Sequence, residues 1–311
     1  WEPLLRQGLL TLVILIDSEG EDGAVSYTDA LKVGSGILGK PVARKPEDMA
    51  LLQYTGGTTG PSKGAVLTHA NIVANQFQVD AFMSCALERG CERILTAVPL
   101  YHILAFSVNF LMFMRYGATN ILVRDPRDRD SFFQSINRNR PTFIVGVNTL
   151  FASLLEASSN LNLHDVHMSL GGGAAIQTAI QQKWHALYGH YILEGYGLSE
   201  TSPVVTSNPA WRKGYHAGIG LPVPGCDVAI MAEDGDFLPQ GAEGEICVRG
   251  PQVMQGYWKR PEETGRAFHG GGWFRTGDIG CMAPDGQFII CDRKKDMIIV
   301  SGFNVYPNEV E

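Results

Sequence analysis

The chain has 311 residues, and its 25 Lys and Arg against 32 Asp and Glu give a formal net charge of −7. With 45% hydrophobic and 18% charged residues, the composition is that of an ordinary folded protein of about two domains, not a disordered or fibrous one. The acidic balance and the absence of a basic run in the sequence exclude an electrostatic surface for nucleic acid.

Six cysteines are scattered without a C-x-x-C pair or a histidine at zinc-ligand spacing, so we expect a reducing compartment and no zinc site. His164 and His167 are expected to be surface groups and not metal ligands. Every apolar run is shorter than the ~20 residues needed to cross a bilayer, and no signal segment is visible. We expect a cytoplasmic protein.

Hydrophobic patterning divides the chain into four parts. Residues 1–48 form a poorly patterned lead-in, 49–210 an α/β part that binds nucleotide and acyl groups, 211–291 a small β-rich subdomain, and 292–311 a hinge with the start of a further domain. From residue 49 to 54 a strand runs into a glycine loop, and the next expected element is a helix over 69–85.

Strands and helices then alternate, which favours an α/β fold with a largely parallel sheet. Strands are expected over 93–98, 119–123, 142–147, 167–170 and 191–195, and helices over 103–115, 131–137, 150–157 and 178–188. After residue 211 the helical periodicity disappears. Short strands over 228–232, 244–249, 273–283 and 287–291, separated by Gly, Pro and Asp turns, predict a β-barrel-like subdomain.

Residues 34–39 satisfy the pattern G-x-G-x-x-G and are followed by Lys40 and Pro41. We interpret this segment as a surface turn. Pro41 stands where a Walker A loop needs Ser or Thr, and no strand is expected before the glycines, as a dinucleotide site requires. A kinase or P-loop ATPase is therefore disfavoured.

A second glycine segment is more specific, because it alternates glycines with hydroxyl residues directly after a strand. Its members are Thr55, Gly56, Gly57, Thr58, Thr59 and Gly60, followed by Lys63. The glycines let backbone N–H groups approach phosphate oxygens, the threonines add donors, and Lys63 adds a positive charge. The segment predicts a phosphate-binding loop.

This loop resembles the signature of the adenylate-forming (AMP-binding) superfamily, which includes acyl-CoA synthetases, luciferases and peptide-synthetase adenylation domains. Further matching segments follow in the family's order at 171–176, 194–200, 272–278 and 292–311. Segments 54–60, 99–106, 146–151 and 300–309 look most like bacterial long-chain fatty-acid:CoA ligases. The resemblance implies part of a layered α/β large domain and a small β-barrel-like subdomain, truncated at both ends, with the C-terminal domain absent.

The reaction that the resemblance implies has two steps. A fatty-acid carboxylate attacks the α-phosphate of ATP, with Mg²⁺ present, to give acyl-AMP and pyrophosphate, and the thiol of CoA then displaces AMP. By resemblance, Thr58 and Lys63 of the loop hold the leaving phosphates, Glu200 binds Mg²⁺, and His102 belongs to the catalytic set.

The resemblance also assigns nucleotide, hinge and CoA contacts. Those to the nucleotide fall on Gly172, Gly173, Ala174, Gly195, Tyr196, Gly197, Ser199, Asp278 and Arg293. Tyr196 would stack on adenine, and Asp278 would accept hydrogen bonds from the ribose. Lys295 matches the pivot of the family's C-terminal domain, and Gly302 would leave room for the pantetheine arm of CoA.

His102 stands where amino-acid-activating relatives generally carry Asp. The following run, 105–114, is strongly apolar, so an ammonium group would find no counter-charge there, whereas an alkyl chain would be accommodated. The expected walls of the acyl pocket are His102, Phe106, Phe110, Gly146 and Val147.

Two alternatives remain: an aryl or medium-chain acid:CoA ligase, or a non-catalytic fragment that binds nucleotide and acyl groups. The family's adenylation Lys lies downstream of Lys295, beyond residue 311, so we expect little or no turnover from these residues alone. Peripheral contact with the inner face of a bacterial membrane is compatible with a substrate drawn from a bilayer. The sequence does not determine the oligomeric state.

Overall fold

The computed structural model describes residues 3, 6–7, 14, 16, 24–36, 39, 42–55, 62–173 and 175–291, together with the backbone of 15, 292–293, 298–300 and 303–305. The chain separates into two compact units, residues 1–44 and residues 45–311. The predicted site residues that the structure describes lie in the second unit.

In the first unit a helix accompanies two short strands. Strands β1 (Ile14–Leu15) and β2 (Val25–Ser26) pair in parallel, and helix α2 spans Tyr27–Gly34. The Ser26 hydroxyl caps this helix by accepting a hydrogen bond from Asp29 N at 3.0 Å. A helix therefore leads into the first glycine segment, as the sequence indicates, and this is not the context of a dinucleotide loop.

The second unit begins with a hairpin that corrects the expected order of strand, loop and helix. Strand β3 (Met49–Thr55) pairs antiparallel with β4 (Lys63–Thr68), and helix α3 (His69–Met83) follows only after β4. Sequence patterning missed β4 because it is six residues long and starts with Lys and Gly. Its pairing with β3 and the burial of Ala65 and Leu67 decide its conformation, not local propensity.

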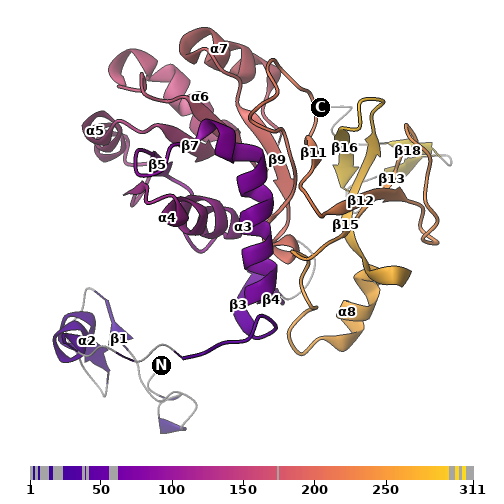
Figure 1. The fold of residues 1–311 in the computed structure, drawn as a ribbon, viewed down its shortest axis with the longest axis horizontal. Coiled ribbons are helices and arrows are strands. Elements are labelled where there is room, and N and C mark those ends of the chain that lie inside the picture. The colour runs from indigo at the N-terminus through magenta and orange to yellow at the C-terminus, as the bar shows by residue number, and fades with distance from the viewer. Residues whose placement is uncertain are drawn as a thin grey trace. The chain divides into compact units, whose positions relative to one another are not determined.

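A seven-stranded sheet forms the centre of the α/β part (Figure 1), in the order β11-β10-β9-β8-β7-β5-β6. Its strands are β5 (Arg93–Thr96), β6 (Thr119–Leu122), β7 (Phe143–Gly146), β8 (Met168–Gly171), β9 (Leu193–Gly197), β10 (Val204–Ser207) and β11 (Leu221–Pro222). Pairing is parallel from β6 to β9 and antiparallel from β9 to β11. The expected α/β class with a largely parallel sheet is confirmed.

Two layers of helices cover this sheet. On one face α3 and residues 105–115 pack into a core that includes Phe82, Phe113 and Phe143. On the other face lie α5 (Arg129–Asn139), α6 (Asn148–Glu156) and α7 (Thr178–Tyr188), around Phe151 and Trp184. Short 3-10 turns occur at Ser84–Ala86, Ser158–Asn160, Ser199–Thr201 (η4) and Gly270–Gly272.

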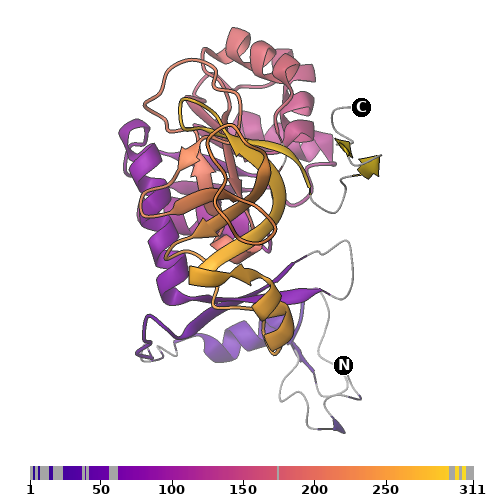
Figure 2. The ribbon, with the colours of Figure 1, turned by 90° about the vertical axis from the view of Figure 1, so that its right-hand side faces the viewer.

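Residues 227–293 form a curled antiparallel sheet beside the α/β part (Figure 2). It contains β12 (Asp227–Met231), β13 (Gly244–Arg249), β14 (Phe268–His269), β15 (Trp273–Met282) and β16 (Phe288–Arg293), with helix α8 at Pro261–Arg266. The curl confirms the expected β-barrel-like subdomain, while α8 is a short helix that patterning missed. Strands β17 (Ile298–Val300) and β18 (Phe303–Val305) pair antiparallel.

The helix expected over 103–115 is mainly a π-helix. Residues Ala105–Met112 (η2) have π geometry, and an α-helical turn at Phe113–Arg115 (α4) completes the segment. Two fully buried polar side chains lie inside η2. Ser107 Oγ donates to Ser202 O at 2.9 Å, and Asn109 Nδ2 donates to Thr96 Oγ1 at 3.0 Å. The wider π turn is a tertiary feature that apolar periodicity does not reveal.

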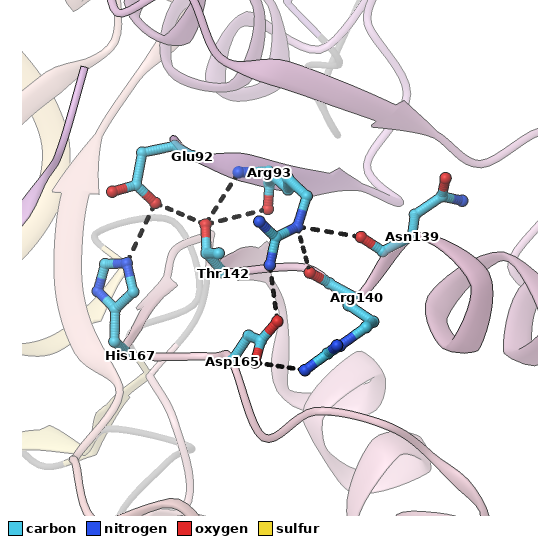
Figure 3. A network of polar contacts seen from close by, with 7 residues as sticks. All are labelled: Glu92, Arg93, Asn139, Arg140, Thr142, Asp165 and His167. Carbon is cyan, nitrogen blue, oxygen red and sulfur yellow. Dashed lines mark hydrogen bonds and ion pairs between the residues drawn. The ribbon is translucent and has the colours of Figure 1, made fainter. Parts of the chain in front are cut away.

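A polar network joins the amino ends of β5, β7 and β8 (Figure 3). Buried Glu92 accepts hydrogen bonds from Glu88 N at 2.8 Å and from Thr142 Oγ1 at 2.5 Å, and its Oε2 lies 3.1 Å from Nε2 of His167. His167 itself is 43% exposed, in agreement with the surface position expected for it. The network lies at the opposite end of the parallel strands from the predicted site, so its role is structural.

We predict that Glu92→Ala lowers the free energy of unfolding by about 2–4 kcal/mol, because it leaves the buried Thr142 hydroxyl and Glu88 amide without their acceptor. Urea unfolding followed by far-UV circular dichroism measures this change. Asp125→Ala, which removes an exposed pair with Arg127, is the control and should leave the urea midpoint unchanged. Equal midpoints for the two variants would show that the Glu92 network does not stabilise the sheet.

Candidate active site

The carboxyl ends of the parallel strands bring most of the predicted residues to one edge of the sheet. Gly146 at the end of β7 is in register with Gly171 of β8, and Gly171 is in register with Glu194 of β9. Segments 146–147, 172–173 and 195–197 therefore lie side by side. This edge of a parallel sheet is where open α/β folds bind ligands.

At this edge two predicted nucleotide glycines lie close to apolar side chains, one of which is the predicted acyl residue Val147. A Cβ placed on Gly172 would lie 3.1 Å from Cδ2 of Leu104, the residue before η2, and one placed on Gly173 would lie 3.8 Å from Cγ1 of Val147. Gly172 is buried and Gly173 is exposed. Any side chain at Gly172 would crowd Leu104, so this position favours glycine, and the exposed Gly173 leaves its backbone open to a ligand.

Tyr196 and Asp278 come from different sheets and meet at the site. The Tyr196 hydroxyl donates to Asp278 Oδ2 at 2.7 Å, and Asp278 is buried. Tyr196 is on β9 and Asp278 on β15, so the bond links the α/β part to the curled sheet. Arg293 is on β16, and its backbone pairs with that of Asp278 on β15. The Arg293 side chain lies outside the described residues.

Glu200 lies in η4, directly after β9, and is buried. Its Oε1 accepts a hydrogen bond of 2.7 Å from the hydroxyl of Tyr257, and its backbone oxygen accepts one of 2.8 Å from Met254 N. Ser199 beside it is half-buried. The carboxylate is thus held by a segment 57 residues further along the chain.

The hairpin places Thr55 and Lys63 opposite each other at its loop end, where residues 56–62 connect the two strands. They are in register, and Thr55 Oγ1 donates to Lys63 O at 3.3 Å. Lys63 Nζ lies 4.6 Å from the centre of the Tyr257 ring. Tyr257 therefore contacts both Lys63 and Glu200. The remaining predicted residues lie outside the described part of the chain: Gly56, Gly57, Thr58, Thr59, Gly60, Ala174, Lys295 and Gly302.

The predicted acyl residues form two neighbouring groups. Phe106 and Phe110 are on η2 with ring centres 6.1 Å apart, and Phe110 is 39% exposed. His102 precedes this helix, and its Nδ1 accepts from Leu104 N at 3.2 Å. Burial lowers the pKa of His102, which favours a neutral ring. The second group is Gly146 with Val147.

Sequence reasoning missed Glu194, which holds the predicted adenine segment. Its Oε2 accepts from Ile176 N at 3.0 Å and its Oε1 from Gln181 Nε2 at 3.1 Å. Burial raises the pKa of this carboxyl. Glu194 opens the motif 194–200, so its presence there was a signal, but only the structure shows that its carboxylate bonds Ile176 and Gln181.

Buried amides of α3 were also missed. The side chain of Asn75 bonds both backbone groups of Val204, donating to its oxygen at 2.7 Å and accepting from its nitrogen at 3.0 Å. Asn71 Nδ2 donates to Pro251 O at 2.7 Å and to Val253 O at 3.0 Å. Helix α3 therefore fixes the backbone on both sides of the Glu200 and Tyr257 pair.

The donor set at Glu200 fits a magnesium ion that arrives with a nucleotide. Within the described residues no group of three His, Cys, Asp or Glu side chains could hold a metal by itself. Mg²⁺ is commonly held by one or two carboxylates together with substrate phosphates. The buried Glu200 carboxylate would be such a ligand, since the described residues supply no donor to its Oε2.

The chain is similar in sequence and fold to known proteins. The family model described as AMP-binding enzyme matches residues 4–258. A long-chain-fatty-acid–CoA ligase of Escherichia coli O6:H1 is 47% identical over 291 residues, covering 93% of this chain and 52% of that protein. A feruloyl-CoA synthase of an Amycolatopsis species is 34% identical over 268 residues, covering 85% of this chain and 53% of that protein.

Among solved structures, ATP-bound MatB from Rhodopseudomonas palustris is 33% identical with a TM-score of 0.83, covering 93% of this chain and 57% of that one. The chain thus spans about half the length of the curated relatives that it matches. In the described part of the chain, each helix is too short or too polar to cross a membrane.

We predict that Gly197→Ala disrupts the turn between β9 and Glu200. A Cβ at this position would lie 1.9 Å from Pro203 O, a backbone atom that cannot rotate away. The free energy of unfolding should fall by about 2 kcal/mol, measured by urea titration. Gly195→Ala is the matched control in the same strand, since its nearest atoms would lie at an ordinary 3.6 Å. The prediction fails if both variants unfold at the same urea concentration.

Proposed function

Since the chain belongs to the family of AMP-binding enzymes, we propose that it serves the ATP-dependent activation of a long-chain fatty acid. In the proposed reaction the carboxylate oxygen forms a bond to the α-phosphorus of ATP while the bond to pyrophosphate breaks. The thiol of CoA then attacks the acyl carbon, loses its proton, and releases AMP. Fatty acid, ATP and CoA are the proposed substrates.

The observation that carries the proposal is that predicted nucleotide glycines lie close to apolar side chains at one edge of the sheet. Gly173 lies near Val147 of the predicted acyl pocket, and Gly172 lies near Leu104, the residue before η2. A nucleotide over the glycines and an acyl chain along η2 would therefore approach each other at this edge. Holding two reactants in that relation converts a bimolecular step into an effectively unimolecular one.

Each polar residue has a separate proposed task. Asp278, fixed by Tyr196, would accept hydrogen bonds from the ribose. Lys63 would balance the charge of the leaving phosphates together with the loop that precedes it. Glu200 would hold Mg²⁺, which when bound would neutralise phosphate charge as it develops.

The apolar character of η2 favours a fatty acid over an amino acid. No carboxylate is found at His102 or along residues 105–112, so a substrate ammonium would be buried without a counter-charge. The 47% identity to a long-chain-fatty-acid–CoA ligase, against 34% to a feruloyl-CoA synthase, supports an alkyl substrate over an aryl one.

Calorimetric titration of this chain with non-hydrolysable adenylates tests the proposal. We expect a long-chain alkanoyl adenylate to bind much more tightly than an aminoacyl or aryl adenylate, because only the alkyl chain can bury apolar surface along η2 without an unpaired polar group. Phe106→Ala should weaken the binding of the alkanoyl adenylate but not the binding of ATP. Equal affinity for all three adenylates would refute the assignment of the acyl site.

We further predict that Glu200→Gln, introduced into the complete enzyme, slows ATP–pyrophosphate exchange at least ~100-fold, because the neutral amide cannot supply the carboxylate ligand for Mg²⁺. The variant keeps the size of the side chain, and its amide oxygen can still accept from Tyr257. Glu243→Gln, a substitution outside the site, is the control and should retain wild-type exchange. A near-normal exchange rate for Glu200→Gln would remove this residue from the catalytic set.

A further inference from the structure

Tyr257 is the one described side chain that contacts both Glu200 and Lys63. Its hydroxyl donates to Glu200 Oε1 at 2.7 Å, and its ring lies under the Lys63 ammonium at 4.6 Å. Neither contact follows from the glycine loop or from the motif around Glu200. Resting on the proposed function, we infer that Tyr257 is a positioning residue that orients the Glu200 carboxylate toward Mg²⁺ and seats Lys63 beside it.

The backbone around Tyr257 fixes where its side chain can reach. Residues 255–258 run antiparallel beside β4, and Tyr257 forms an isolated bridge with Ala65. The bonds Val66 N to Gly256 O (2.9 Å), Gln255 N to Val66 O (3.1 Å) and Trp258 N to Gly64 O (2.7 Å) hold it there. The tyrosine is therefore attached to the strand that begins at Lys63, and it reaches from that strand to Glu200.

The hydrogen bond leaves one carboxylate oxygen for a cation. A tyrosine hydroxyl is protonated at neutral pH, so the Tyr257 hydroxyl donates to Glu200 Oε1. Oε1 is occupied by this bond, which fixes the rotation of the carboxylate. Oε2 receives no donor from the described residues. A partner that fixes a metal-binding carboxylate in this way commonly changes metal affinity 10–100-fold when removed.

The test is the Mg²⁺ dependence of ATP binding, measured by calorimetry on this chain with a non-hydrolysable ATP analogue. For Tyr257→Phe we expect the half-saturating Mg²⁺ concentration to rise about 10-fold or more. Affinity without Mg²⁺ should stay at the wild-type value, because the phenylalanine ring remains under Lys63. An unchanged Mg²⁺ requirement would overturn the inference.

Tyr116→Phe is the matched control. This tyrosine also donates to a carboxylate, Asp80, but it is buried in the core on one face of the sheet. It should lose stability without a change in Mg²⁺ dependence. If both tyrosine variants shift the Mg²⁺ requirement equally, the effect of Tyr257 is only structural.

Two further measurements separate this inference from the proposed function. In a Glu200→Gln background, Tyr257→Phe should have no additional effect on Mg²⁺ dependence, since the two residues act together. Wild-type protein whose ATP affinity does not respond to Mg²⁺ would refute the proposed role of Glu200 itself. If Tyr257→Phe does not fold, NMR spectra of wild-type protein with ¹³Cζ-labelled tyrosine replace it. One tyrosine resonance should then shift when Mg²⁺ is added to wild type and should not shift in Glu200→Gln. The absence of such a resonance would refute the inference.

Discussion

Backbone hydrogen bonds of residues 254–258 hold the two halves of the candidate site at a fixed separation. On one side this segment pairs with β4, which begins at Lys63, and on the other Met254 N donates to Glu200 O at 2.8 Å. These bonds are between backbone groups, so they depend on conformation and not on side-chain identity. The spacing between the cation of the hairpin and the carboxylate of η4 follows from them.

The position of this segment depends in turn on polar side chains buried beneath it. Asn75 is completely buried, and such an amide is costly unless its hydrogen bonds are made. Its two bonds to Val204 are possible in one arrangement of that backbone only. Ser202 Oγ adds a bond of 2.9 Å to Gln252 O. Because the buried amides of α3 need these hydrogen bonds, they fix the backbone of the turn that carries Glu200.

The local sequence pattern was sufficient to predict most helices and strands of the α/β part and the residues at the strand ends. The strand before Thr55, the alternation that produces the parallel sheet, and the glycines after β8 all follow from spacing and turn chemistry. Strand β4 and the π geometry of η2 do not, because tertiary pairing decides both. Tyr257 could not be found either: its link to Glu200 spans 57 residues, and neither residue type nor local spacing encodes such a contact.

In the π-helix η2, the residues that anchor the helix to the core differ from the residues proposed to contact the acyl chain. Ser107 and Asn109 anchor its backbone to Ser202 and Thr96 by hydrogen bonds inside the core. Phe106 and Phe110 are not part of these bonds, and their rings contact each other. Phe106 also packs against the core cluster of Ala65 and Met254, whereas Phe110 is 39% exposed. A change in the size of the Phe110 ring therefore need not move the polar anchors or the turn of Glu200. Under the proposed function, the acyl site would thus vary at Phe110 while the arrangement that would receive the nucleotide stays the same.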